Sequence, residues 1–308
     1  MTPIVRAFRP SDAEAAAEVR SAALPFLVTT PAMPARRAER EPAERRYRAL
    51  VAELDGQVVG LVEAGLLIET AEPDAAFAHL YVHPGATGRG AGSALATAAE
   101  GHLSEAGAGS VYTWVYDDGR SPAWAERRGY RRRRMARFLR LDLAGTPLPA
   151  ETAPPAGITL RTAAGFAADP RPLYELDMET TADEPGDVTP DAMPYAAWLT
   201  ANWERPSLDR DLSVVAVDAA GVPVAFTVAD TDGRTRYMTT MTGTARSHRG
   251  RGLAKLVKNR SLRLAREAGY REAFTGNDAE NGPMPAVNRW FGYEPAGGEW
   301  RYVRELRL

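Results

Sequence analysis

Residues 249–252 alternate arginine and glycine, and this stretch of the chain is the best suited to hold an anion. Glycine lacks a Cβ, so the backbone can turn tightly there and bring successive N–H groups close to a phosphate. Arg249 and Arg251 add positive charges that persist at any working pH. The pattern therefore predicts a phosphate-binding turn.

A strand before this turn and a helix after it are needed to position it. Tyr237 to Ala245 is rich in strand-forming residues, and Leu253 to Glu267 has helical spacing up to Gly269. The first N–H groups of a helix lack partners within it, and the helix dipole favours an anion there. A pyrophosphate at Gly252 to Ala254 would thus be held by the backbone. The simpler alternative is a glycine turn that only leads into an amphipathic helix.

The first half of the chain contains a second copy of this turn, which is a possible second site. It retains the glycines but has Thr87 where Arg249 stands in the second half. We therefore expect weaker anion binding there. A packing partner that helps to shape the substrate cleft of the second half is favoured over a second active site. The residues of the possible second site are Gly88, Arg89, Gly90 and Gly92. Three pairs of glycines repeat at a spacing of 162 or 163 residues: Gly90 and Gly252, Gly107 and Gly269, Gly129 and Gly292.

The repeat predicts two domains of one plan. We expect an amino-terminal domain over residues 1–145, a Pro/Ala/Gly-rich linker over 146–156 and a carboxy-terminal domain over 157–308. The patterns predict strands, hairpins and helices in the same order in each half. In the first half they cover 3–8, 11–23, 44–47, 49–54, 58–68, 77–82, 93–105, 111–116, 122–127 and 129–143. In the second half they cover 158–161, 173–180, 192–203, 213–217, 222–228, 237–244 and 253–267.

The second copy resembles the GNAT superfamily of acyl-CoA-dependent acyltransferases. Arg249, Gly252 and Ala254 fit the superfamily's Arg/Gln-x-x-Gly-x-Gly/Ala motif. The resemblance continues through Thr275-Gly276-Asn277, Asn281, Met284, Asn288 and Phe291-Gly292-Tyr293. It implies an α/β fold of two tandem GNAT domains, each a twisted mixed sheet flanked by helices. In that fold acyl-CoA, the expected co-substrate, lies in a V-shaped splay between strands 4 and 5.

The resemblance also implies roles for single residues in the second half. The superfamily's oxyanion donor is usually a backbone N–H on strand 4, and a tyrosine often protonates the leaving thiolate. Here Asn288 occupies the position of that tyrosine, so water, Tyr237 or Tyr293 would act instead, or the thiolate would leave as the anion. Further donor contacts would come from Asn277 and Asn281, with helix capping as the alternative for Asn281. The expected donor-binding residues are Met241, Thr242, Gly243, Thr244, Arg249, Gly250, Arg251, Gly252, Leu253, Ala254, Asn277 and Asn281.

Amide formation from a thioester needs a deprotonated amine, so a general base is expected near the acceptor. An acidic run between the first two helices of the second half would line that region in the superfamily. Glu179 and Asp177, together with Asn288, are the candidate catalytic residues, and a solvated helix face is the alternative for the acidic run. Its members are Glu175, Asp177, Glu179, Asp183, Glu184 and Asp187.

The function expected from the resemblance is transfer of an acyl group, most often acetyl, to the amine of a small molecule. Two alternatives remain open: a non-catalytic CoA-binding sensor, and an acyltransferase whose donor is a carrier-protein thioester. The second is suggested by the four consecutive arginines 131–134, which could bind an anionic partner, either the CoA 3′-phosphate or an acidic acyl carrier protein, although protection of an edge strand is favoured over both.

Composition narrows the class of protein further. A net charge of -2 gives no general attraction to nucleic acid or anionic membranes, and the lack of cysteine excludes disulfides and thiolate metal ligands. The four histidines show no metal-binding spacing, so no metal is expected. The absence of a signal peptide or long apolar run favours a cytoplasmic protein. The preference for arginine over lysine, with abundant Ala, Gly and Pro, suggests a bacterial source.

Overall fold

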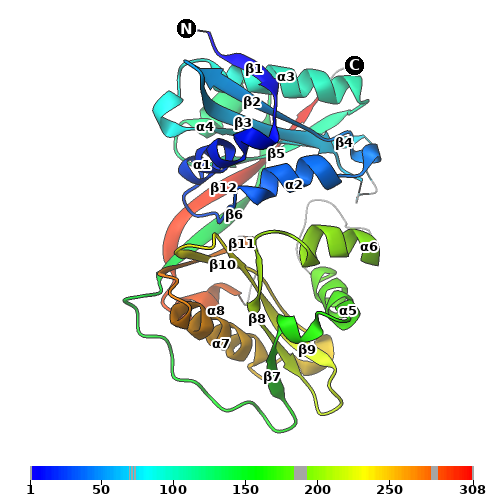
Figure 1. Cartoon of the computed structure of the whole chain (residues 1–308), viewed down its shortest axis with the longest axis vertical. Coiled ribbons are helices and arrows are strands. Elements are labelled where there is room, and N and C mark those ends of the chain that lie inside the picture. The colour runs from blue at the N-terminus through cyan, green and yellow to red at the C-terminus, as the bar shows by residue number, and fades with distance from the viewer. Residues whose placement is uncertain are drawn as a thin grey trace. The chain divides into compact units, whose positions relative to one another are not determined.

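Two compact units make up the chain, and each is built around a mixed β-sheet (Figure 1). The computed structural model describes residues 2–306 except 69, 71, 73, 184–192 and 279–283. Unit 1 contains Met1–Ala136 and Gly297–Leu308, and unit 2 contains Arg137–Ala296. The α/β architecture with two sheet-based units agrees with the expectation from the sequence.

The sheet of unit 1 has the strand order β1-β2-β3-β4-β5-β12. Neighbouring strands run antiparallel, except that β4 and β5 are parallel. The connection between these parallel strands is a helix, as a parallel pair requires. The strands are β1 Ile4–Ala7, β2 Arg48–Leu54, β3 Gln57–Leu66, β4 Ala75–Val82, β5 Ser110–Tyr116 and β12 Glu294–Glu305.

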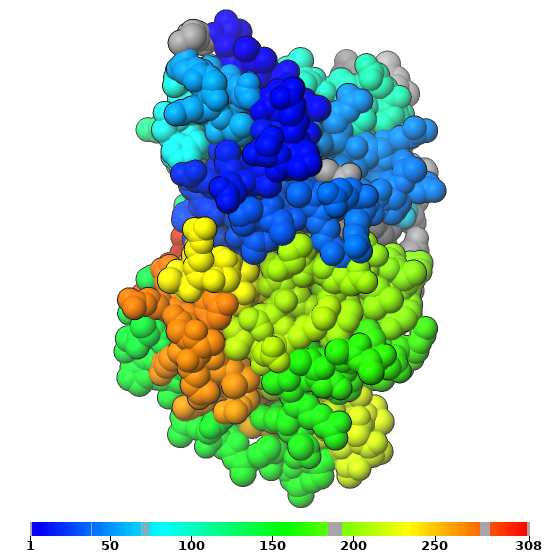
Figure 2. Space-filling view, viewed as in Figure 1, coloured from blue at the N-terminus to red at the C-terminus, as the bar shows by residue number. Residues whose placement is uncertain are grey.

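Helices cover both faces of this sheet. The connecting helix α3, Ala91–Glu105, packs Leu95, Ala99 and Leu103 into an apolar core with the inward side chains of β2 to β5. On the other face lie α1, Ala13–Ala23, and α2, Ala32–Arg40 (Figure 1). In the space-filling view these two helices hide most of the strands behind them (Figure 2). The short helix α4, Ser121–Arg127, follows β5.

Unit 2 repeats this plan with the strand order β7-β8-β9-β10-β11-β6. Its parallel pair is β10 and β11, joined by α7, Leu253–Glu267, and the pairs from β7 to β10 are antiparallel. The strands are β7 Thr159–Thr162, β8 Leu208–Val217, β9 Pro223–Thr231, β10 Arg236–Thr244, β11 Glu272–Asp278 and β6 Arg131–Asp142. The remaining helices are α5 Arg171–Thr181, α6 Tyr195–Trp198 with a π-helical turn over Leu199–Trp203, and α8 Met284–Trp290.

The last strand of each half joins the sheet of the other half. Strand β6 follows α4 of the first half but neighbours β11, and β12 follows α8 of the second half but pairs with β5 from Glu299↔Tyr116 to Glu305↔Ser110. The unit boundaries at 136/137 and 296/297 therefore lie inside these strands. The expected domains, 1–145 and 157–308, differ from these units because a strand pattern does not specify its partner strand.

Residues 146–156, expected as a linker, pack along α7 within unit 2. Asn259 Nδ2 donates to the Pro149 carbonyl at 3.1 Å, and Arg263 Nη2 donates to the same oxygen at 2.6 Å. One expectation for the first half was wrong, and one helix was not expected. The helix expected at 44–47 is a single 3-10 turn, Ala43–Arg45, and the helix of this region is α2, whose pattern the prolines obscured.

Candidate active site

The glycine turn of unit 2 lies between strand and helix, as the sequence predicts. After β10 the chain passes through a 3-10 turn, Arg246–His248, and then reaches Gly250 and Gly252, whose φ angles are 76° and 77°. A side chain is strained at such positive φ, so glycine is required there. Gly252 is the N-cap of α7, and the Leu256 N–H donates to its carbonyl at 3.1 Å.

The backbone N–H groups of residues 250–255 have no hydrogen-bond partner in the part of the chain that the structure describes. They cluster where the dipole of α7 is most positive, so an anion would satisfy several at once. The side chain of Leu253 points into the core and is 1% exposed, so this residue can contribute only its backbone. The turn is therefore suited to bind an anion such as a phosphate.

The two arginines of the turn differ in their surroundings. Arg249 Nη2 lies 2.5 Å from Asp183 Oδ2, and Arg246 Nη2 lies 2.7 Å from the other oxygen of the same carboxylate. Hydrogen bonds from Arg246 and then Arg249 lower the pKa of Asp183. Arg251 is exposed. Asp183, just beyond the carboxy-terminal end of α5, thus forms ion pairs with Arg246 and Arg249, which could otherwise bind a phosphate.

A splay opens beside this turn. Strands β10 and β11 pair in parallel only over Arg236–Thr239 and Glu272–Thr275, and beyond Thr239 strand β10 keeps its register with β9 alone. The backbone of Met241 to Thr244 therefore has one free edge, where a pantetheine amide could add as a strand does. Gly243 is closely covered, since a Cβ there would lie 2.7 Å from both Phe226 and Thr180.

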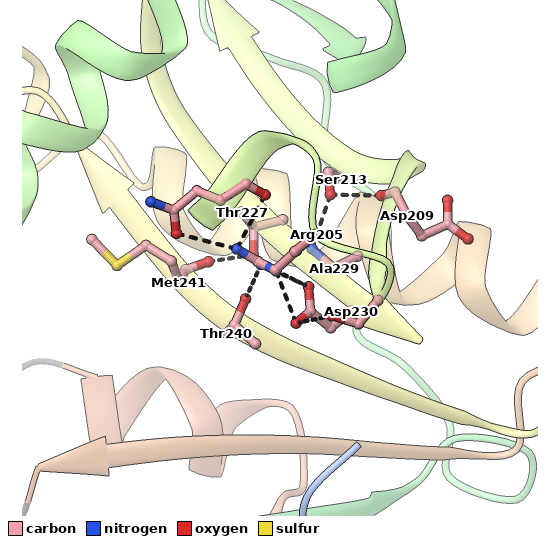
Figure 3. A network of polar contacts seen from close by, with 10 residues as sticks. Arg205, Asp209, Ser213, Thr227, Ala229, Asp230, Thr240 and Met241 are labelled. Carbon is pink, nitrogen blue, oxygen red and sulfur yellow. Dashed lines mark hydrogen bonds and ion pairs between the residues drawn. The ribbon is translucent and has the colours of Figure 1, made fainter. Parts of the chain in front are cut away.

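A β-bulge between Thr239 and Met241 starts this splay, and a buried ion pair fixes it (Figure 3). Arg205 Nη2 donates to Asp230 Oδ1 at 2.6 Å and to Thr240 Oγ1, in the bulge, at 3.0 Å. Ser207 Oγ donates to Asp230 Oδ2 at 3.0 Å. A bulge re-aims backbone groups. This network therefore determines where the N–H groups of β10 point.

Asn288 is wholly buried, at 0% exposure. Its Oδ1 accepts from Lys258 Nζ at 2.6 Å, and its Nδ2 donates to Asn277 Oδ1 at 2.5 Å. Because Asn288 Oδ1 accepts from Lys258 and Asn288 Nδ2 donates to Asn277 Oδ1, the Nδ2 group of Asn277 remains available as a donor. The structure thus gives Asn288 an orienting role, while Asn281 lies outside the described residues.

The two carboxylates expected as general bases are both hydrogen-bonded. Asp177 Oδ2 accepts from Trp198 Nε1 at 2.6 Å, and Glu179 Oε1 accepts from the backbone N–H of Arg246 at 2.7 Å. Burial raises the pKa of Asp177, although the bond from Trp198 and the charge of Arg205 oppose this. Glu179 instead ties α5 to the glycine turn.

The tyrosines considered for protonating the thiolate are not available to it. Tyr237 is 0% exposed and its hydroxyl bonds Ser261 Oγ at 2.7 Å. Burial raises its pKa to about 12. Tyr293 is 4% exposed, and burial likewise raises its pKa. The burial of both hydroxyls favours the two remaining alternatives, which are protonation by water and departure of the thiolate as the anion.

Unit 1 contains the same turn beside the same kind of splay. Gly88 and Gly90 have φ angles of 76° and 90°, the Ala94 N–H donates to the Gly90 carbonyl at 3.0 Å, and the N–H groups of residues 88–93 lack partners among the described residues. Arg89 Nη2 pairs with Asp55 at 3.2 Å. A Cβ at Gly92 would meet only ordinary contacts, so that glycine is not required by space.

Four of the groups that shape these sites were not expected from the sequence. Lys258 lies among apolar residues on α7, and only its position on that buried stripe could have indicated burial. The other three groups make their contacts only in the tertiary structure. They are Arg205, Asp230 and Glu299. Within the described residues, no group of three or more acidic or histidine side chains is arranged to hold a metal, and no helix could span a bilayer.

Comparison with known proteins agrees with this geometry. The model of the acetyltransferase (GNAT) family matches residues 14–130, in the half whose glycine motif lacks its arginine. A solved GCN5-related N-acetyltransferase from Sphaerobacter thermophilus is 24% identical, with a TM-score of 0.70, over 99% of this chain and 96% of its own. A tandem GNAT protein from the clavulanic acid biosynthesis pathway is 21% identical, with a TM-score of 0.73, over 98% of both chains. No curated protein sequence matched.

The family match and the fold lead to one conclusion. The family model covers unit 1 from α1 to the start of β6, and the solved tandem protein shares the fold over both units. Each unit has a glycine turn with unpartnered N–H groups beside a splayed parallel pair. Residues 14–130 therefore match the acetyltransferase (GNAT) family, and the chain as a whole has the tandem GNAT fold.

Proposed function

We propose that unit 2 transfers an acyl group, most simply acetyl, from acyl-CoA to the amine of a small molecule. The observation that carries the proposal is the run of unpartnered N–H groups at residues 250–255 beside the open edge of β10. Pyrophosphate would bind the turn with Arg249 and Arg251, and pantetheine would lie along Met241 to Thr244. Asn277 Nδ2 would donate to a pantetheine carbonyl.

In this proposal the amine attacks the thioester carbonyl directly. The N–C bond forms, the C–S bond breaks, and a backbone N–H of β10 stabilises the oxyanion of the tetrahedral intermediate. Asp177 is the better placed of the two candidate bases, because burial raises its pKa whereas Glu179 is held by the turn. The thiolate leaves with the bonding electrons and takes its proton from water.

The proposal is tested with purified full-length protein, acetyl-CoA and a panel of small amines, with thiol release and acetyl-CoA binding both measured. Arg249→Glu should weaken acetyl-CoA binding to unit 2 about tenfold or more, because it places a negative charge beside the phosphates. Arg234→Glu, on the exposed β9–β10 hairpin, is the matched control. Equal effects of the two substitutions on binding and turnover would contradict the proposal.

A CoA-binding sensor is the second candidate, favoured by the burial of Tyr237 and Tyr293. It predicts acetyl-CoA binding that Arg249→Glu weakens, with no thiol release for any amine. A carrier-protein donor receives less support, since several arginines near 131–134 already form ion pairs inside the chain. Arg131 Nη2 lies 2.7 Å from Glu305, and Arg132 Nη2 lies 3.1 Å from Glu126.

A further inference from the structure

One face of the unit 1 sheet is polar where the other is an apolar core. Register pairs place Glu63 beside His79 and Glu299 beside Tyr116, all on the face that α1 and α2 cover. The alternate residues, such as Val62 and Ala78, point into the core under α3. Titratable groups therefore gather on the face opposite the core.

Two carboxylates on this face differ in the hydrogen bonds and ion pairs that they make. Glu63 Oε1 accepts from Tyr47 Oη at 2.8 Å and from Arg37 Nη1 at 3.4 Å. Glu299 is 7% exposed and makes no hydrogen bond or ion pair with any described residue. A buried carboxylate without a partner is costly, so a ligand that supplies a donor would be strongly favoured there.

A positive charge close by is equally unpartnered. Arg20, on α1, has its guanidinium 5.3 Å from the centre of the Tyr81 ring, and its Nε is buried without a hydrogen bond. No carboxylate of the described residues lies within ion-pairing distance of it, Glu299 included. Its charge nevertheless acts on Glu299, Glu63 and Tyr81, so these groups share one site.

Unit 1 also has the features expected to bind the acyl donor. Strands β4 and β5 pair in parallel only from Ala75↔Ser110 to Phe77↔Tyr112, and they separate beyond that point. The unpartnered N–H groups of residues 88–93 lie at the start of α3, which follows β4. Thr87 replaces an arginine here, but the backbone groups that would hold a pyrophosphate are retained.

We propose that unit 1 is a second acyl-transfer site, whose acceptor is a small molecule carrying both a primary amine and a carboxylate. Glu299 binds the amine as its general base, and Arg20 binds the acceptor's carboxylate. The inference shares the acyl-CoA chemistry of the function proposed above but does not depend on unit 2. Because Glu299 belongs to β12, the exchanged strand completes this site.

The reaction balances within these groups. The ammonium of the acceptor loses a proton to the Glu299 carboxylate, its nitrogen forms a bond to the acyl carbon, and the C–S bond breaks. The electron pair leaves with the thiolate, which takes the second proton that the nitrogen loses as the amide forms. Burial raises the pKa of Glu299 to about 7, with the charge of Arg20 opposing, so the group can exchange protons near neutral pH. The other ionisable groups that the structure places on this face are Glu63, His79, Tyr81, Tyr116 and Arg301, with Arg37 and Tyr47 bonded to Glu63.

The experiment measures thiol release from acetyl-CoA by the full-length chain, with the standard amino acids and with the amines that lack their carboxylates. Because Arg249→Glu weakens acetyl-CoA binding to unit 2, the transfer to amino acids that persists in this variant reports on unit 1. Glu299→Gln should lower kcat for amino acids by roughly 100-fold and abolish its rise through pH 7. Arg20→Gln should raise KM for amino acids and leave KM for the decarboxylated amines unchanged. Glu305→Gln, exposed on the same strand, is the control.

The two proposals fail in different ways. Loss of all transfer in Arg249→Glu, with full activity in Glu299→Gln, would overturn the site in unit 1 and support unit 2. Full activity in Arg249→Glu with loss of activity in Glu299→Gln would support the site in unit 1 and contradict transfer by unit 2. Equal use of amines without a carboxylate would overturn the assignment of Arg20, and a chain with no thiol release would overturn both sites. An unchanged melting temperature confirms that the variants are folded.

Discussion

Lys258 should make the stability of unit 2 depend on pH. The side chain is 0% exposed, and burial lowers its pKa to about 7 from an ordinary value of 10.5. The unfolded chain therefore holds this proton more tightly than the folded one. Folding is penalised as pH falls from about 10.5 to about 7, and the penalty is constant below that range. Between pH 9 and pH 7 the penalty grows by about 2 kcal/mol.

Lys258→Met removes this titration while keeping an unbranched side chain. In urea unfolding followed by fluorescence, the free energy of unfolding of the wild type should fall by about 2 kcal/mol relative to Lys258→Met between pH 9 and pH 7. The loss of the bond to Asn288 is a constant that cancels in this comparison. Lys255→Met, on the exposed side of α7, should keep the wild-type pH dependence. Parallel curves for wild type and Lys258→Met would refute the reasoning.

Three further predictions concern the splay and the turn of unit 2. Gly243→Ala should lower the free energy of unfolding by about 1–3 kcal/mol in urea titrations, because its Cβ would collide with its neighbours, and an unchanged value would contradict the packing. Asp183→Ala should release Arg249 and lower the Kd for acetyl-CoA roughly two- to fivefold by calorimetry, whereas weaker binding would show that Asp183 helps the ligand. Arg205→Gln should lower kcat about 100-fold by freeing the bulge, with a smaller loss for Thr240→Ala, and equal wild-type rates would exclude this role.

The sequence by itself determined the repeated units, the glycine turns and most of the element order. Glycine is needed at Gly90 and Gly252 because positive φ is strained for other residues, and the apolar periods of α3 and α7 follow from their own spacing. These features are local, so a short stretch of residues specifies them. The same locality explains why α2 was missed, since prolines within a short segment disguise its period.

Only the tertiary structure decided which strands complete which sheet and which polar groups meet. The patterns of β6 and β12 predict strands, but the partner of a strand depends on the folded chain. This exchange of strands brings Glu299 to the face of unit 1 where Arg20 lies. The two residues are nearly the whole chain apart in the sequence. Burial, too, is a property of the fold: the packing of α7 and α8 joins the buried Asn288 to Lys258, a contact that neither residue's sequence position indicates. Contacts between residues far apart in the sequence thus determine the burial and the partners of these polar groups. The sequence alone does not specify either.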